Sequence, residues 1–126
     1  MEKYFVTHSQ AVTLKELGFD EPCISWYTVF GKFSNDYSNP KKYNSEYELG
    51  SFISAPLKSQ VFEWFREKYN LISCIRTISY GCTINEQEFY CEIVSVRGVS
   101  SYSLHNKFEE AESECIDKLI EIVKNK

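Results

Sequence analysis

Tyrosine and lysine side chains alternate in one polar segment of the chain, and both residue types can bind a ligand. Tyr37, Tyr43 and Tyr47 are interleaved with Lys41 and Lys42. Aromatic rings stack on bases, at about 1 to 3 kcal/mol per base, while ammonium groups contact phosphate. Tyrosine is also frequent in the hot spots of protein interfaces. The segment therefore predicts a site for a small nucleotide or for a protein partner.

Arg76 is a further candidate, because a cation interrupts an otherwise apolar strand pattern at this position. Two alternatives need no ligand. Arg76 could lie on the solvent face of an open sheet, and the tyrosines could pack their rings down and leave only their hydroxyl groups in water. The predicted ligand-binding set contains Tyr37, Lys41, Lys42, Tyr43, Tyr47 and Arg76.

Catalytic chemistry has little support in the residue spacing. Cys82, in a predicted turn, could be a nucleophile with His105 as its base only if the fold brought them together. Glu88 and Glu92 would lie about 13 Å apart along one strand, too far to share a metal ion without a third ligand. No known catalytic or phosphate-binding signature occurs. We therefore expect no catalytic residue, metal or cofactor, with a small nuclease or thiol-dependent enzyme as the alternative.

The composition limits the partners. Lys and Arg number 14 against 18 Asp and Glu, so the net charge of −4 disfavours binding to bulk nucleic acid. The apolar runs are too short for a membrane span or a signal peptide. Five cysteines without a C-x-x-C pair indicate buried, reduced thiols and a cytoplasmic protein. A homo-oligomer is compatible with these features.

The first helix is predicted by signals at both of its ends. Thr7 and Gln10 have the spacing of a capping box, and Gly18 can adopt the left-handed conformation that ends a helix. Phe19 can then fold back on Leu14, as in a Schellman ending. These signals predict a helix from His8 to Leu17.

Two longer helices are predicted by their apolar stripes. Pro56 suits the first turn of a helix from Leu57 to Tyr69, which Asn70 can close. Asn106 is the predicted N-cap of a helix from Lys107 to Lys124, with acids near its start and lysines near its end. The expected core residues on these two helices are Trp64, Phe65, Leu119 and Ile120.

Strands are expected between the helices. Residues Cys23–Phe33, Leu71–Tyr80, Phe89–Arg97 and Val99–Leu104 are rich in β-branched and aromatic residues, while Ser34–Ser51 has no sustained period and predicts a long loop. The short connections between the later strands favour antiparallel pairing. We therefore predict a single α+β domain over residues 1–126, with an antiparallel sheet of three to four strands and three helices packed mainly on one face.

Three stretches carry a resemblance to a known group of proteins. They are Leu17–Cys23, Ala55–Tyr69 and Phe108–Glu121. In these stretches the chain resembles a family of small uncharacterised proteins of gut Bacteroidetes, their phages and mobile elements. The matching pieces lie at helix boundaries and on amphipathic helices, so they describe architecture rather than catalytic residues.

The resemblance implies a phage or mobile-element accessory protein in the cytoplasm of the host cell. Antagonism of host anti-phage defence is its most concrete form. A non-enzymatic protein could capture a nucleotide signal, or it could block a host defence protein. A structural accessory protein with no ligand is the remaining alternative.

Overall fold

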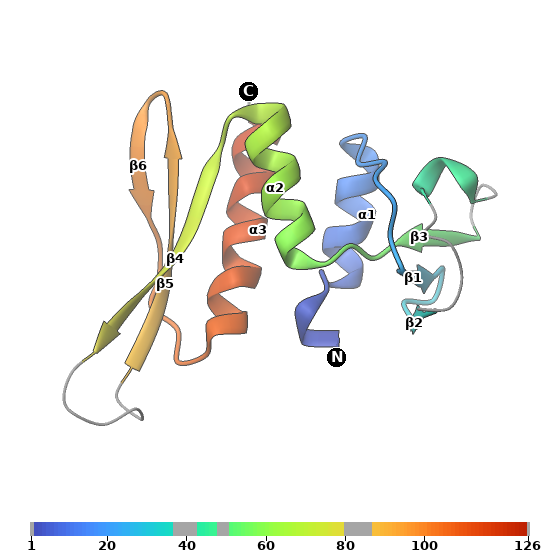
Figure 1. Cartoon of the computed structure of the whole chain (residues 1–126), viewed down its shortest axis with the longest axis horizontal. Helices are drawn as coiled ribbons and strands as arrows, with labels where there is room; N and C mark the ends of the chain where they lie inside the picture. Colours follow the sequence, from blue (N-terminus) through green and yellow to red (C-terminus); the bar gives the residue numbers. More distant parts are fainter. Residues whose placement is uncertain (1, 37–42, 48–50, 80–86, 126) are drawn as a thin grey trace. The chain divides into compact units, whose positions relative to one another are not determined.

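The computed structural model describes residues 2–36, 43–47, 51–79 and 87–125. The chain divides into two compact units, unit 1 (residues 1–58) and unit 2 (residues 59–126). Each contains one three-stranded antiparallel sheet (Figure 1). Within the described residues, none of the helices has the length and apolar character that spanning a bilayer requires.

Unit 1 combines one α-helix with short strands and two 3₁₀ turns. Strand β1 lies in the centre of its sheet, between β2 and β3. The elements are η1 (Glu2–Tyr4), α1 (His8–Glu16), β1 (Ser25–Thr28), β2 (Phe33–Asn35), η2 (Asn44–Glu46) and β3 (Phe52–Ser54).

The predicted ends of α1 are confirmed. The Gln10 backbone N–H donates to Thr7 Oγ1 at 3.3 Å, and the Thr7 N–H donates to Gln10 Oε1 at 3.0 Å, which completes the capping box. Gly18 has a φ of +93°, and the Phe19 N–H donates to the Leu14 carbonyl at 2.9 Å. This is the hydrogen bond of a Schellman ending.

The predicted strand Cys23–Phe33 is wrong as a single strand, because the chain reverses within it. The Gly31 N–H donates to the Thr28 carbonyl at 2.9 Å, and Gly31 has a φ of +84°. A side chain would be strained there, so glycine permits the turn between β1 and β2. His8, half-buried, lies against Gly31 and against the ring of Tyr27, 5.4 Å away. Phe30, at the tip of this hairpin, is 95% exposed.

Unit 2 is a layer of helix on sheet. Strand β5 lies between β4 and β6, and α3 contacts β5 and β4 on one face of the sheet (Figure 1). The elements are α2 (Lys58–Tyr69), β4 (Ile72–Ser79), β5 (Gln87–Ser95), β6 (Gly98–Ser101) and α3 (Phe108–Lys124).

The core of unit 2 forms largely where α3 meets β5. Cys115, Ile116 and Leu119 of α3 and Cys91 and Ile93 of β5 are all buried. The four core residues predicted from the sequence, Trp64, Phe65, Leu119 and Ile120, are buried as well, so that prediction is confirmed. The predicted N-cap Asn106 is wrong: Lys107 occupies the cap position, and it makes no capping hydrogen bond through its side chain.

The α+β class and the antiparallel pairing are confirmed. The strands form two sheets rather than one, because β1 pairs with β2 and β3 inside unit 1. The prediction of a single domain stays a prediction. Cys74, expected in the core, is exposed, because Ser73 and Ile75 lie opposite the buried Ile93 and Cys91 and leave the alternate positions of β4 on the outer face.

Candidate functional site

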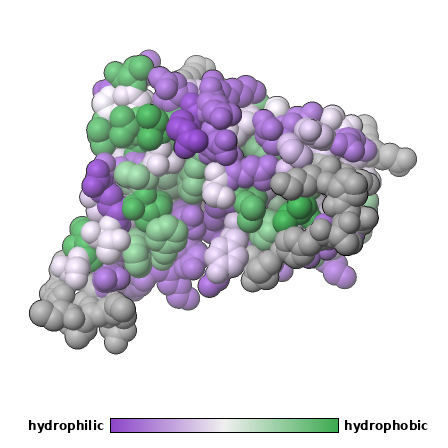
Figure 2. Space-filling view, in the orientation of Figure 1, coloured by the Kyte–Doolittle hydropathy of each residue, from purple (hydrophilic) through white to green (hydrophobic). Residues whose placement is uncertain are grey.

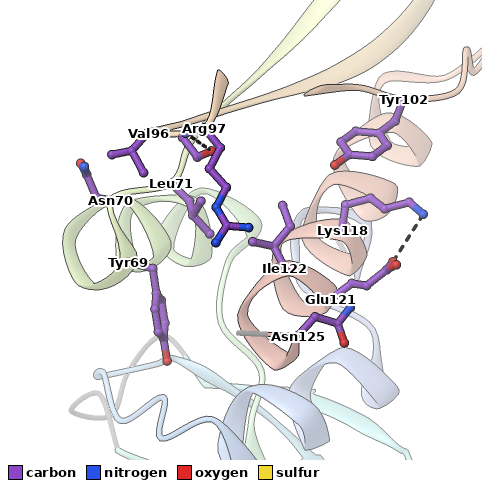
Figure 3. Close-up of a pocket in the computed structure, with 11 residues that line it drawn as sticks. Tyr69, Asn70, Leu71, Val96, Arg97, Tyr102, Lys118, Glu121, Ile122 and Asn125 are labelled. Atoms are coloured by element: carbon purple, nitrogen blue, oxygen red, sulfur yellow. Dashed lines mark hydrogen bonds and ion pairs between the residues drawn. The ribbon is translucent and has the colours of Figure 1, made fainter. Parts of the chain in front are cut away.

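A pocket of about 360 Å³ lies in unit 2, and three segments of the chain form it. The end of α2, the turn between β5 and β6, and the C-terminal half of α3 converge there (Figure 3). This volume lies within the range of small-molecule sites, near its lower end. The lining residues are Tyr69, Asn70, Leu71, Ser95, Val96, Arg97, Tyr102, Lys118, Glu121, Ile122 and Asn125.

The end of α2 places Tyr69 and Asn70 at the pocket. Asn70 has a φ of +55°, and asparagine tolerates this left-handed conformation better than most residues. The helix therefore ends at Tyr69, and the Leu71 N–H donates to the Phe65 carbonyl at 3.3 Å. The chain then enters β4 with Leu71 buried.

The turn between β5 and β6 places Arg97 at the pocket. The Arg97 N–H donates to Ser95 Oγ at 3.2 Å, and Gly98, with a φ of +126°, lets the chain reverse. The guanidinium group extends into the pocket toward Ile122 (Figure 3). Among the residues that the structure describes, none forms an ion pair with Arg97.

Helix α3 forms the third wall. Lys118, Ile122 and Asn125 follow the i, i+4, i+7 spacing, so they share one face of the helix. Lys118 Nζ lies 3.4 Å from Glu121 Oε2 and 5.5 Å from the centroid of the Tyr102 ring. The tyrosine ring thus has a cation on one face, within the range of a cation–π contact.

The charges of the pocket are set by two cations and one anion. Arg97 and Lys118 together exceed Glu121 by one positive charge, in a chain whose net charge is −4. The ends of α2 and α3 also reach the pocket, and the carbonyl groups there carry partial negative charge. The guanidinium group of Arg97 can therefore interact either with the carbonyl groups at these helix ends or with an anionic ligand.

Three of the predicted binding residues, Tyr37, Lys41 and Lys42, lie outside the described residues. The structure places Tyr43 and Tyr47 at the two ends of η2 in unit 1. Tyr43 is exposed, whereas Tyr47 is half-buried, with its ring 5.7 Å from that of Phe52. Burial, together with Cys23 and Glu46, raises the pKa of Tyr47.

Arg76, the sixth predicted residue, belongs to unit 2 and has an intramolecular partner. Its Nε atom lies 2.8 Å from Glu92 Oε2, and the Tyr90 hydroxyl group donates to the same oxygen at 3.3 Å. The hydrogen bond with Glu92, followed by the attraction of its charge, raises the pKa of Arg76. Arg76 does not line the pocket that contains Arg97. The binding role of the predicted set stays a prediction.

His105 lies between two carboxylates. Its Nδ1 atom is 3.7 Å from Glu110 Oε2, and its Nε2 atom is 3.4 Å from Glu114 Oε1. In the described part of the chain, no three His, Cys, Asp or Glu residues are grouped so that they could hold a metal ion. Cys82, considered as a nucleophile with His105, lies outside the described residues.

The described cysteines Cys23, Cys74, Cys91 and Cys115 are free thiols. A hydrogen bond with Cys91 and burial raise the pKa of Cys115 far above its ordinary value. A thiol with so high a pKa stays protonated and is a poor nucleophile. We therefore assign this buried pair to the core.

The pocket residues were missed by the sequence analysis because they lie where elements end. Two features of the sequence indicate the position of the pocket: Asn70 after an amphipathic helix, and Arg97-Gly98 between two strands. Such turns commonly carry ligand-binding side chains. No family model, curated protein or solved structure matches this chain.

Proposed function

We propose that this chain is a non-enzymatic binding protein whose unit 2 holds a small anionic ligand of the nucleotide class. The observation that carries the proposal is the guanidinium group of Arg97, which extends into a cavity of about 360 Å³ without an ion pair among the described residues. Tyr69 and Tyr102 line the same cavity. A guanidinium group suits phosphate, and the phenol rings suit a base.

The size and charge of the pocket favour a single nucleotide over a longer nucleic acid. A volume near the lower end of ligand sites suits one base with its sugar and phosphate. The net charge of −4 repels a polyanion at long range, while the local excess of one positive charge attracts a small anion. Binding of this kind requires no chemical step.

The resemblance to proteins of Bacteroidetes phages suggests a setting for such a binder. A phage protein that holds a nucleotide signal in the host cytoplasm removes that signal from a defence pathway. The nucleotide would dissociate only as fast as its contacts with Arg97 and the tyrosines allow. The phage origin, the cytoplasmic location and the defence role are all parts of this proposal.

A second function, the blockade of a host protein, is favoured by a different observation. Phe30 is 95% exposed at the tip of the β1–β2 hairpin. Bonds from the backbone N–H of Lys32 to Thr28 Oγ1, at 3.1 Å, and from the Thr28 N–H to the Lys32 carbonyl, at 2.9 Å, hold that tip. An exposed aromatic side chain on a hydrogen-bonded turn is a typical anchor for a protein interface.

Mass spectrometry of small molecules released from the denatured protein tests the nucleotide first. Isothermal titration with a panel of mononucleotides then measures the affinity. We expect Arg97→Ala and Tyr102→Ala each to weaken binding about tenfold or more, because each removes a direct contact. Arg66→Ala and Tyr4→Ala are the matched controls, since both residues are exposed and neither lines the pocket.

Thermal unfolding of the same variants separates ligand binding from a role at the helix ends. If Arg97 only compensates the partial charges of α2 and α3, Arg97→Ala lowers the melting temperature and no nucleotide binds to either protein. That result would overturn the nucleotide proposal. A host protein that binds wild-type chain but not Phe30→Asp, with no nucleotide bound, would support blockade instead.

A further inference from the structure

The outer face of the unit 2 sheet carries a row of aliphatic side chains. Ile72 lies opposite Val94, and Val94 lies opposite Val99, so one residue from each strand stands in a single line across β4, β5 and β6. Because Ile93 and Cys91 are buried on the face that meets α3, the alternate positions of β5 lie on the other face.

This row is open to solvent. Ile72 is 48% exposed and Val99 is 62% exposed. Val96, in the adjoining turn, is 91% exposed. Figure 2 shows hydrophobic surface at this end of the sheet, where β5 turns into β6. Contiguous exposed aliphatic residues, unlike isolated ones, commonly mark an interaction surface.

The two rows beside the aliphatic one carry no net charge. Cys74, Glu92 and Ser101 stand in the next row, and Arg76 and Tyr90 in the one after it. Glu92 accepts hydrogen bonds from both Arg76 and Tyr90, so the single cation and the single anion of these rows neutralise each other. Glu88, opposite Ile78, adds a negative charge in the fourth row, farthest from the aliphatic one. The aliphatic row and the two rows beside it therefore have no net charge that would select an oppositely charged partner.

A second copy of this chain presents the same aliphatic row with neutral rows beside it, so it can pack against this face. Two chains of net charge −4 repel each other over most of their surfaces, but they can approach where both faces are neutral and aliphatic. The eight paired residues of β4, the eight of β5 and the four of β6 form a face of about 320 Å², since the strands lie about 4.8 Å apart and rise about 3.3 Å per residue. Two such faces form a small interface, which fits a weak dimer with a dissociation constant in the micromolar range.

We propose that two copies of this chain dimerise by packing the outer faces of their β4–β5–β6 sheets against each other across a two-fold axis. The rows that contain Ile72, Val94 and Val99 are buried in this dimer. The proposal does not depend on the nucleotide, because the pocket that contains Arg97 and the aliphatic row are separate groups of residues.

Sedimentation equilibrium over a range of protein concentrations tests the dimer. We expect Val99→Asp to weaken dimerisation at least tenfold, because each interface would bury two carboxylates. Val29→Asp is the matched control, since Val29 is a valine of similar exposure, 48%, at the hairpin tip of unit 1. Circular dichroism checks that both variants remain folded, and Ile72→Lys repeats the test on another strand.

Cross-linking gives a second measurement of the same arrangement. Cys74 is the exposed thiol among the described cysteines, and it stands one row from the aliphatic residues. In a Cys82→Ser background, we expect a short bismaleimide to join two chains through Cys74, and Cys74→Ser to prevent this. A protein that stays monomeric to about 500 µM, well above a micromolar dissociation constant, would overturn the proposal. So would a dimer that Val99→Asp leaves unchanged.

Discussion

Units 1 and 2 each contain a three-stranded antiparallel sheet, yet their strands differ in length. Those of unit 1 have three or four residues, whereas β4 and β5 of unit 2 have eight and nine. In unit 2 a continuous ladder of backbone pairs and the apolar face of α3 define the layer. In unit 1 the short strands need additional contacts from side chains that are distant in sequence.

Asn44 and Tyr27 supply two such contacts. Asn44 Nδ2 donates to the Phe19 carbonyl at 2.9 Å, and Asn44 Oδ1 accepts from the Ser54 N–H at 2.8 Å. The Tyr27 hydroxyl group donates to the Val6 carbonyl at 2.7 Å. Hydrogen bonds from single polar residues can thus join a small sheet to the segments around it. A larger sheet is stabilised instead by the apolar surface that it buries.

The largest expected effect comes from the apolar face of unit 2. Leu119→Ala should lower the free energy of unfolding by about 3 to 5 kcal/mol, because it leaves a cavity at a fully buried position of α3. Leu104→Ala is the control, since Leu104 is exposed. Hydrogen exchange should show the loss of protection in β5. An equal loss in β1 would mean that the two units unfold together and that this residue does not stabilise unit 2 alone.

A somewhat smaller effect is expected from Asn44→Ala in unit 1. The substitution leaves the Phe19 carbonyl and the Ser54 N–H without their side-chain partner, at about 2 to 4 kcal/mol for the two groups. Denaturant unfolding measures this loss. Asn35→Ala serves as control, because Asn35 is exposed in β2. A loss no greater than that of the control would show that unit 1 does not depend on this residue.

Tyr27 should make unit 1 sensitive to alkaline pH. Burial, followed by the charge of Glu2, raises the pKa of Tyr27 above its ordinary value of 10.0. The raised pKa means that the folded state holds the phenol proton more tightly. The stabilisation is thus complete below pH 10 and is lost as the pH rises through the folded pKa.

The substitution Tyr27→Phe measures both the hydrogen bond of the Tyr27 hydroxyl group and its effect on stability at alkaline pH. We expect it to cost about 1 to 3 kcal/mol at neutral pH, because the buried Val6 carbonyl loses its hydrogen bond. We also expect a smaller decline of stability above pH 10 than in the wild type. Denaturant unfolding at neutral pH and at pH 10 to 11 provides the two values. Parallel declines would assign the alkaline sensitivity to other groups.

The smallest expected effect comes from the start of α1. Thr7→Ala removes the oxygen that accepts from the Gln10 N–H and should cost about 1 kcal/mol. Thr7→Ser keeps that oxygen and should restore most of the stability. Thermal unfolding of the two variants gives the difference. Equal losses in both would mean that the methyl group of Thr7, rather than its capping oxygen, stabilises unit 1.

The same difference between the units explains what could be predicted from the sequence. In unit 2 the apolar period of α3 and the alternation in β4 and β5 are long enough to read, so their positions were predicted within a few residues. In unit 1, β2 and β3 have three residues each, too few for a period. Gly31 reverses the chain inside a continuous β-branched and aromatic run, so one strand was predicted where a hairpin forms.

The pocket was beyond prediction because its residues come from three separate elements. Tyr69, Arg97 and Lys118 are each unremarkable in the sequence, and the sheet and α3 bring them to one cavity. The predicted aromatic and basic set was chosen instead from neighbours along the chain. Arg76 shows the limit of that approach, since its partner Glu92 lies on the next strand.

The order of elements along the chain also affects what happens during synthesis. β3, the last strand of the unit 1 sheet, ends at Ser54, so every strand of that sheet exists before most of α2 has been made. The sheet of unit 2 cannot be covered until α3, the last element of the chain, has been synthesised. Until then Cys91 and Ile93, which are buried in the complete fold, lack the cover of α3. On the ribosome, unit 1 can therefore fold early, while unit 2 presents an open apolar sheet that a chaperone can bind.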